Sequence, residues 1–392
     1  MTKIRFKKSQ NILLHYLREY LKRAAIPKID ELSHLSLEDH HRIFMEVCKH
    51  WVSEGFYHGL KNIKGVNEIL PNEILEKLKN NYEMTLCRNT LLFYELENLL
   101  KWIHATGAQV IILKGAALSQ TVYSNIALRA FGDIDLLAQP NDWPKLKNAL
   151  RELGFTPDRN YDELTEQDVW DYTCSFRTLN FRKTDPLPIH LDIHFNSVHL
   201  GWSKAESHQL WSRALEIKMP NAAALGLCPE DLLVHLCIHL TFHNFGKLQW
   251  FVDIYKTIQY YNETLDWNQL INESKGKGRI LPLYYGLSYT KRLLDCPIPS
   301  WVLEELKPNL FLRKQFEFNW HQKEILQLKP KSHATFGLVW LMTEGFWDKL
   351  KYIFQTVFPP ISWLRCHYSL PRAKKNYLYY FQHFVNLLRA KL

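Results

Sequence analysis

Apolar residues recur at helical spacing in two stretches of the first hundred residues. The first stretch includes Ile12, Leu13, Leu14, Tyr16, Leu17, Tyr20 and Leu21. The second begins at Pro71, continues through Leu78, Leu92 and Leu99, and ends at Gly107. A proline at the start and a glycine after the end are typical helix boundaries, because proline lacks a backbone N–H and glycine tolerates left-handed conformations. We therefore expect residues 1–106 to form a helical N-terminal region.

The pattern changes to short apolar runs after Ala108. Residues 110–113 (Val-Ile-Ile-Leu) are apolar and mostly β-branched, which predicts a buried strand. The following segments predict a short helix over 116–123, a loop over 124–132, a strand around 134–137 and a helix over 140–153. Two further strands, 174–181 and 189–195, flank a turn at Asp185-Pro186 and predict a hairpin. These elements define an α/β core over residues 107–200.

Helical spacing returns from Gly201 onward. One helix begins at Pro229, and a second includes Trp250, Phe251, Ile254 and Ile258. Residues 201–392 are therefore expected to form a C-terminal helical domain. The fold class that we predict is α+β, with a small sheet-containing core flanked by helical N- and C-terminal regions.

Composition and charge narrow the function classes. The chain is 46% apolar and 23% charged, as in an ordinary globular protein, and its net charge of +9 favours anionic partners such as nucleotides, nucleic acid or anionic membranes. Its seven cysteines are odd in number and form no CxxC pair, which argues against a disulfide framework or a zinc knuckle. The N-terminus does not resemble a signal peptide, and no apolar run approaches the roughly 18 residues of a membrane helix. We expect a cytoplasmic protein without a transmembrane segment.

The first candidate for chemistry is the pair Asp133 and Asp135 at the start of a predicted strand. Side chains alternate along a strand, so both carboxylates share one face and Ile134 lies on the other. Adjacent carboxylates repel each other unless a cation lies between them, and Mg²⁺ prefers such oxygen ligands. The alternative for an isolated pair of this kind is a strand end with solvated acids.

A third carboxylate comes from the strand Ile189-His190-Leu191-Asp192-Ile193-His194-Phe195. Its strict alternation places His190, Asp192 and His194 on one face. If this strand lies near the first, Asp192 either binds the metal or accepts a proton from an attacking hydroxyl. The alternative is a polar sheet face on which the histidines hold Asp192.

Two cationic features precede these acids. Lys114-Gly115 follows the buried strand and opens a helix, where glycine allows backbone N–H groups to approach a phosphate and Lys114 adds charge. The alternative is a turn with a solvated lysine. Arg129 either holds a triphosphate or pairs with a nearby acid, and the sequence does not distinguish the two.

Taken together, these residues resemble the DNA polymerase beta-like nucleotidyltransferase superfamily. The similarity is strongest to an uncharacterised bacterial branch, through Leu113-Lys114-Gly115, Tyr123, Arg129, Asp133-Ile134-Asp135-Leu136-Leu137 and Asp192-Ile193-His194-Phe195. It is good over residues 90–260 and looser in the C-terminal third. Lys114-Gly115 stands where relatives usually carry Gly-Ser or Gly-Gly, and the spacing from Gly115 to Asp133 is longer than in many of them.

The resemblance implies a small mixed-sheet core and transfer of a nucleoside monophosphate, with release of pyrophosphate. It implies that Asp133, Asp135 and Asp192 are metal ligands and catalytic residues for Mg²⁺, with Mn²⁺ as an alternative ion. Lys114, Gly115, Arg129, His194 and His239 become the expected substrate-binding residues. The partners are a nucleoside triphosphate and an unknown acceptor, which is a small molecule, a sugar or a peptide. An RNA end is a less favoured acceptor, and a catalytically inactive nucleotide-binding or RNA-binding protein on the same fold is the alternative function.

Two further patterns favour packing over chemistry. His235, His239 and His243 share one helix face, but the acid of a zinc-protease motif is missing, so packing or a polar wall of the active site is preferred. The basic, amphipathic tail over 374–392 is expected to dock on the helical domain rather than on a membrane surface.

Overall fold

The computed structural model describes residues 6–23, 30–162, 164–173, 178–185, 187–195, 204–319, 325–326, 340–342, 346–368 and 376–389. Nineteen α-helices have bounds within these ranges. They are α1 (Lys8–Arg23), α2 (Asp30–Ser33), α3 (Leu37–Lys49), α4 (Ser53–Leu60), α5 (Val66–Ile69), α6 (Asn72–Ala105), α7 (Lys114–Thr121), α8 (Trp143–Glu152), α9 (Glu166–Thr173), α10 (Lys204–Ser212), α11 (Pro229–Phe242), α12 (Leu248–Tyr260), α13 (Trp267–Asn272), α14 (Ile280–Leu294), α15 (Ser300–Glu305), α16 (Leu310–Asn319), α18 (Phe346–Val357), α19 (Ile361–Tyr368) and α20 (Asn376–Arg389).

Seven strands form one mixed sheet. They are β1 (Val110–Leu113), β2 (Asp133–Ala138), β3 (Thr156–Pro157), β4 (Leu179–Lys183), β5 (Ile189–His194), β6 (Leu215–Lys218) and β7 (Ala223–Gly226), and two short 3₁₀ helices, Ile126–Leu128 and Pro140–Asp142, precede β2 and α8. The strand order is β3-β4-β5-β2-β1-β7-β6. The pairs β2–β5 and β1–β7 are parallel, whereas β1–β2, β3–β4, β4–β5 and β6–β7 are antiparallel. The fold is α+β, as the sequence predicts.

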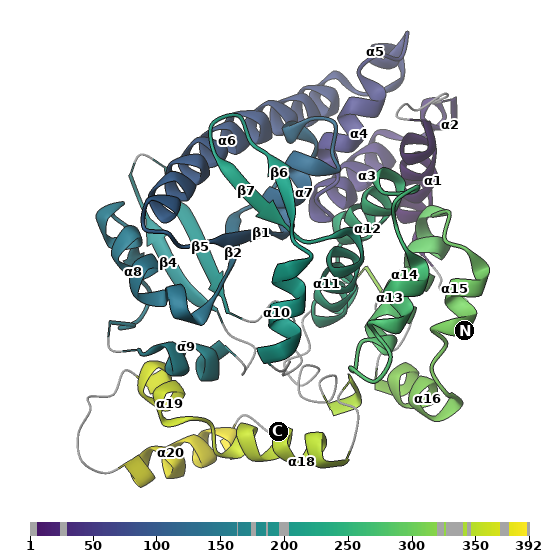
Figure 1. The fold of residues 1–392 in the computed structure, drawn as a ribbon. Helices are drawn as coiled ribbons and strands as arrows, with labels where there is room; N and C mark the ends of the chain where they lie inside the picture. The colour runs from purple at the N-terminus through teal and green to yellow at the C-terminus, as the bar shows by residue number, and fades with distance from the viewer. Residues whose placement is uncertain are drawn as a thin grey trace.

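Each face of the sheet belongs to a different apolar core. On one face, Ile112, Ile134 and Leu136 pack with α8 and with the C-terminal half of α6. On the other face, Ile111 and Leu137 belong to a larger core that also contains the N-terminal helices and helices α11–α15. Figure 1 shows α6 running behind the sheet, and the N-terminal helices together with α11–α15 to the right of it.

The N-terminal helices and helices α11–α15 form one packed body. Their buried residues share a single core, and Arg18 on α1 donates to the carbonyl oxygens of Arg292 and Leu293 at the end of α14, over 3.2 and 2.8 Å. Figure 1 shows α1 and α3 beside α12 and α14. The two helical regions, which lie far apart in the sequence, therefore make one wall opposite the acid-bearing face of the sheet.

The prediction of only helices after Gly201 is wrong for residues 215–226. Strands β6 and β7 lie there, and β7 pairs with β1 in the middle of the sheet. The sheet consequently extends beyond the expected boundary at residue 200. Both strands are only four residues long. β7 consists of Ala-Ala-Leu-Gly and has no β-branched residue, and β6 has only Ile217, so the composition that identifies a strand from sequence is weak here.

Other predicted elements agree closely. The long α6, the strand β1 and helices α11 and α12 begin and end near the expected residues. The hairpin of β4 and β5 forms as predicted, although β4 covers 179–183 rather than 174–181, and residues 174–177 and Pro186 lie outside the described residues. The expected helix over 140–153 begins as a 3₁₀ turn before α8.

The C-terminal tail helix docks on other helices of residues 201–392, as expected, and through them reaches the sheet-containing core. Helix α20 packs against α18 and α19, and α19 packs against α9 of the sheet-containing core. Trp363 and Leu364 of α19 belong to the core between the sheet and α8. Among the described helices, none is both long and apolar enough to cross a membrane.

Candidate active site

Three carboxylates meet on one face of the sheet at the junction of β2 and β5. Asp133 and Asp135 alternate with the buried Ile134 on β2, and Asp192 on β5 is the register partner of Asp135. Adjacent strands lie about 4.8 Å apart, and partners across a parallel pair point to the same side. The fold therefore brings together the three acids that the sequence singled out, although Asp192 comes 57 positions after Asp135.

Asp135 is the buried centre of this cluster. Its side chain is 2% exposed, and its Oδ1 accepts hydrogen bonds from Lys114 Nζ at 2.6 Å and from His194 Nε2 at 2.9 Å. Burial would raise the pKa of this carboxyl, but the charges and hydrogen bonds of Lys114 and His194 outweigh it and hold the pKa well below its usual range. Asp135 is consequently ionised at neutral pH, with Lys114 and His194 as its hydrogen-bond donors.

The other two acids are less well compensated. Partial desolvation and the charge of Asp135 raise the pKa of Asp133, which stands at the solvent-exposed start of β2. The same two causes raise the pKa of Asp192, whose Oδ1 accepts a hydrogen bond from Asn180 Nδ2 at 2.6 Å. Sequence reasoning did not select Asn180. Its only signal is its place on the hairpin partner of β5, opposite Asp192.

Lys114 places its ammonium among all three acids. Burial lowers the pKa of this group, but the charges of Asp135, Asp133 and Asp192 raise it overall. Its backbone adopts φ 45°, in the left-handed region. That conformation is uncommon for a residue with a side chain and is typical of strained functional positions. Lysine thus occupies the position in the turn where the backbone favours glycine.

Gly115 is needed for packing. A Cβ at this position would lie 2.6 Å from Phe131 Cβ and 2.7 Å from an Arg129 guanidinium nitrogen. The sequence interpretation assigned this glycine to a close approach of phosphate. In the structure its missing side chain makes room for the segment that leads into β2.

Arg129 lies in a buried ion pair. Its guanidinium donates to both carboxylate oxygens of Asp253 on α12, at 3.2 and 2.8 Å, and Tyr123 Oη donates to Asp253 Oδ1 at 2.7 Å. Arg129 is 6% exposed and Asp253 is 1% exposed. Of the two interpretations of Arg129, the structure shows the ion pair with a nearby acid.

Helix α6 also holds the segment between α7 and β2, through hydrogen bonds from its side chains to backbone carbonyl oxygens of that segment. Asn89 is fully buried, and its Nδ2 donates to the carbonyl oxygens of Ile126 and Arg129 at 2.6 and 2.9 Å. Arg88 donates to the carbonyl oxygen of Gly132 at 3.4 Å. Because α6 binds the carbonyl oxygens of Arg129 and Gly132, the backbone just before β2 is held in place, and with it the two acids of β2.

A wall of aromatic and basic side chains from the helical body faces the acids. The rings of His239 and His243 lie 4.5 Å apart, and Trp250 contacts both, at 5.3 and 4.8 Å between ring centroids. Partial desolvation and the positive charges of Lys114 and Lys247 lower the pKa of His243, so this ring is neutral at pH 7. Of the three histidines that share this helix face, His239 and His243 pack with Trp250, and His235 is buried.

The donor chemistry of the site fits a divalent cation. Mg²⁺ prefers carboxylate oxygens, and Asp133, Asp135 and Asp192 together carry more negative charge than Lys114 neutralises. Within the described ranges, no three His, Cys, Asp or Glu side chains are already arranged as a coordination shell. The Lys114 and His194 bonds both fall on Oδ1 of Asp135.

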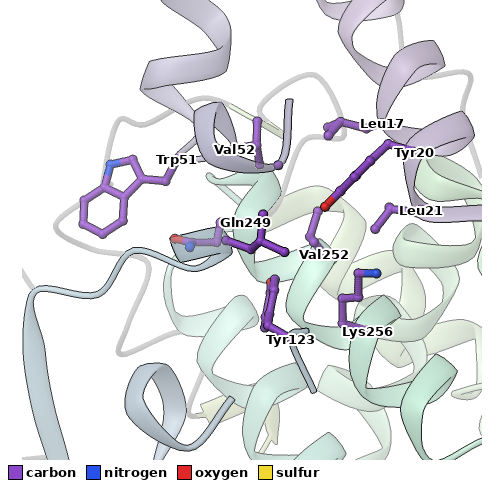
Figure 2. Close-up of a pocket in the computed structure, with 11 residues that line it drawn as sticks. Leu17, Tyr20, Leu21, Trp51, Val52, Tyr123, Gln249, Val252 and Lys256 are labelled. Carbon is purple, nitrogen blue, oxygen red and sulfur yellow. The ribbon is translucent and has the colours of Figure 1, made fainter. Parts of the chain in front are cut away.

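A small cavity lies beside this wall, between α1, α4 and α12. Figure 2 shows its lining, which includes Tyr20, Trp51, Tyr123, Gln249 and Lys256. Its internal volume of about 20 Å³ is room for about one water molecule. This cavity is too small for a nucleotide, so it is not the substrate site.

The α+β fold with its mixed sheet is consistent with the class of nucleotidyltransferases. The sequence model of the uncharacterised nucleotidyltransferase family matches residues 28–295. That match covers well over half of the chain, and the chain therefore belongs to this family. It includes the whole sheet and ends at Asp295, which caps the C-terminus of α14. A search of curated proteins found no significant match.

Proposed function

We propose that this protein transfers a nucleoside monophosphate from a nucleoside triphosphate to a hydroxyl or phosphate group of an acceptor and releases pyrophosphate. The observation that carries this proposal is the pairing of Asp135 with Asp192 across parallel strands, with Asp133 on the same face. Membership of the nucleotidyltransferase family supports it. The acceptor is a small molecule, a sugar or a peptide.

Asp133, Asp135 and Asp192 are the residues that would hold Mg²⁺ or Mn²⁺. When bound, such an ion neutralises negative charge on the phosphates and polarises the phosphoryl oxygen at the reacting centre. Lys114 neutralises Asp135 before substrates bind. In the presence of a triphosphate, its ammonium is placed to exchange Asp135 for a phosphate oxygen, because it already lies among the acids.

The transfer itself needs one bond made and one broken. The acceptor oxygen forms a bond to the α-phosphorus, and the bond between that phosphorus and the oxygen bridging to the β-phosphate breaks, so pyrophosphate leaves. Where the acceptor is a hydroxyl, its proton passes to Asp192. Asp192 is positioned for this step by its register beside Asp135 and by Asn180, whose Nδ2 donates to its Oδ1 at 2.6 Å.

The experiment is incubation with each of the four α-labelled nucleoside triphosphates and Mg²⁺ or Mn²⁺, with pyrophosphate release and self-labelling as readouts. Calorimetry measures nucleotide binding in parallel, with and without metal, and needs no acceptor. We expect metal to strengthen binding, because three carboxylates and a triphosphate otherwise repel each other. Equal affinity with and without metal would contradict the metal assignment.

Asp192→Asn separates catalysis from binding. The amide keeps the shape of the side chain and loses its charge, so we expect nucleotide binding to persist while turnover falls by about 10²–10⁴. Asp185→Asn, in the exposed turn between β4 and β5, is the matched control and should leave turnover unchanged. Near-normal turnover in Asp192→Asn would remove Asp192 from the reaction. Nucleotide binding without pyrophosphate release in the wild type would indicate an inactive nucleotide-binding protein.

A further inference from the structure

Lys247 is a basic residue beside the acid cluster, and it has no role in the proposed reaction as described above. It is the N-cap residue of α12 and follows a tight loop in which Asn244 and Phe245 both adopt φ 55°. Phe245 anchors the loop, because its side chain is 1% exposed and its backbone N–H donates to the carbonyl oxygen of Leu240 at 3.0 Å. The backbone that carries Lys247 is therefore held in place.

Two indole rings hold the ammonium of Lys247. Its Nζ lies 3.4 Å from the ring centroid of Trp51 and 5.3 Å from that of Trp250. Cation–π contacts orient a lysine without neutralising it. In the part of the chain that the structure describes, Lys247 forms no ion pair with a carboxylate. We name Trp51, Lys247 and Trp250 the indole–lysine cluster.

The cluster lies beside the acids. Gln249, two residues after Lys247, donates from Nε2 to the carbonyl oxygen of Ala130 at 3.2 Å, and Ala130 is three residues before Asp133. The charges of Asp133 and Arg129 both act on the Lys247 ammonium. An anion at the acid cluster therefore meets Lys247 on the helical wall and Lys114 on the sheet.

One member of the cluster is also partly exposed to solvent. Trp51 is 42% exposed and adopts φ 58° in the turn between α3 and α4. Figure 2 shows its indole projecting away from the other labelled side chains. A large aromatic side chain that is both exposed and strained in its backbone is an unusual feature, and such positions are typical of binding sites.

We propose that the indole–lysine cluster binds the nucleotide of the proposed reaction, with Lys247 on the triphosphate and the exposed indole of Trp51 against the base. This inference rests on the proposed function. It gives Lys247 the role for which sequence reasoning considered Arg129, whose guanidinium is engaged by Asp253. Stacking on an aromatic ring tolerates every base, so the cluster recognises nucleotides as a class.

The test is calorimetry with Mg²⁺ and two probes, α,β-methylene-ATP and adenosine, on the full-length chain. Lys247→Ala should weaken α,β-methylene-ATP binding about tenfold or more and leave adenosine binding unchanged, whereas Lys247→Arg should restore most of the loss. Trp51→Ala should weaken both probes about tenfold, and Trp51→Phe should weaken them less. The matched controls are Lys256→Ala, on the same helix, and Trp102→Ala, an indole of similar exposure on α6.

The outcomes separate this inference from the proposed function. If Lys114→Ala weakens triphosphate binding while Lys247→Ala and Trp51→Ala bind like wild type, the cluster is not the nucleotide site and the proposed function stands. If the wild-type chain binds neither probe, the proposed function and this inference both fail. Circular dichroism of each variant checks that the helical wall has folded.

Discussion

Lys114 combines a left-handed backbone conformation with a buried ion pair to Asp135. Glycine would adopt this backbone without strain, but it would leave Asp135 without its cation. Lysine at this position therefore costs backbone strain and places a positive charge among the three acids. Sequence reasoning identified the lysine and its charge. It did not predict the left-handed backbone at Lys114, and it gave Gly115 the role of letting backbone N–H groups approach a phosphate.

Substitutions at Lys114 separate the cost of the left-handed backbone from the loss of the ion pair. Lys114→Gly and Lys114→Ala both lose the ion pair, but alanine keeps the strain of a positive φ, which costs roughly 1–2 kcal/mol for an L-residue. We expect the glycine variant to be more stable than the alanine variant by about 1 kcal/mol in urea denaturation without nucleotide.

Lys101 is a solvent-exposed residue within α6 and provides a control in which the stability difference between the glycine and alanine variants has the opposite sign. There the glycine variant should be about 1 kcal/mol less stable than the alanine variant, because glycine is a poor helix former. Equal stability of the two Lys114 variants would mean that this turn is not left-handed in solution.

At the scale of elements, the path from α7 to β2 depends on close packing against a glycine. The start of α7 touches Phe131 and Arg129 where Gly115 has no side chain. The same segment is fixed from α6 by Asn89. These contacts, rather than hydrogen bonds within the segment alone, set the position at which β2 begins and therefore where Asp133 points.

Gly115→Ala should disturb this path. The added Cβ would lie within 3 Å of both Phe131 and Arg129, and overpacking of this kind typically costs about 1–3 kcal/mol. Gly132→Ala is the matched control, because no atom lies within 4 Å of its added Cβ. Urea denaturation should show the loss for Gly115→Ala and little change for Gly132→Ala. Equal behaviour of the two would remove the packing role of Gly115.

For the whole molecule, the ion pair between Arg129 and Asp253 joins the sheet-containing core to the helical body. Arg129 stands in the segment before β2, and Asp253 lies on α12 beside the aromatic wall. Both are buried, so the pair fixes the relative position of the two walls of the site. A buried charge that loses its partner is strongly destabilising, whereas an exposed pair contributes little.

Removing one partner should therefore unfold the protein more easily. Arg129→Met or Asp253→Leu should each cost about 3–5 kcal/mol of unfolding free energy, because the remaining charge stays buried. The double variant should recover much of this loss. Arg151→Met, which breaks an exposed pair with Asp162, should cost less than about 1 kcal/mol. Additive losses in the double variant would show that the two side chains do not interact.

The sequence by itself determined the long helices, the strands β1, β2 and β5, and the identity of the three acids. Each of these depends on a local rule: periodicity of apolar residues, β-branched composition or alternation along a strand. Local rules do not report which strands become neighbours. The register that places Asp192 beside Asp135 arises only when β5 joins β2, and the charge of Asp192 acquires its environment at that point.

Tertiary structure alone decided the partners of the cations and the second wall of the site. Arg129 could pair with any acid until folding brought α12 against it, and Lys247 gained its indole partners because α3, α4 and α12 converge. Strand β7 has no β-branched residue and forms where β1 offers it an edge, and β6 then pairs with β7. Contacts between residues separated by a hundred or more positions depend on packing of the whole chain, which no short segment encodes.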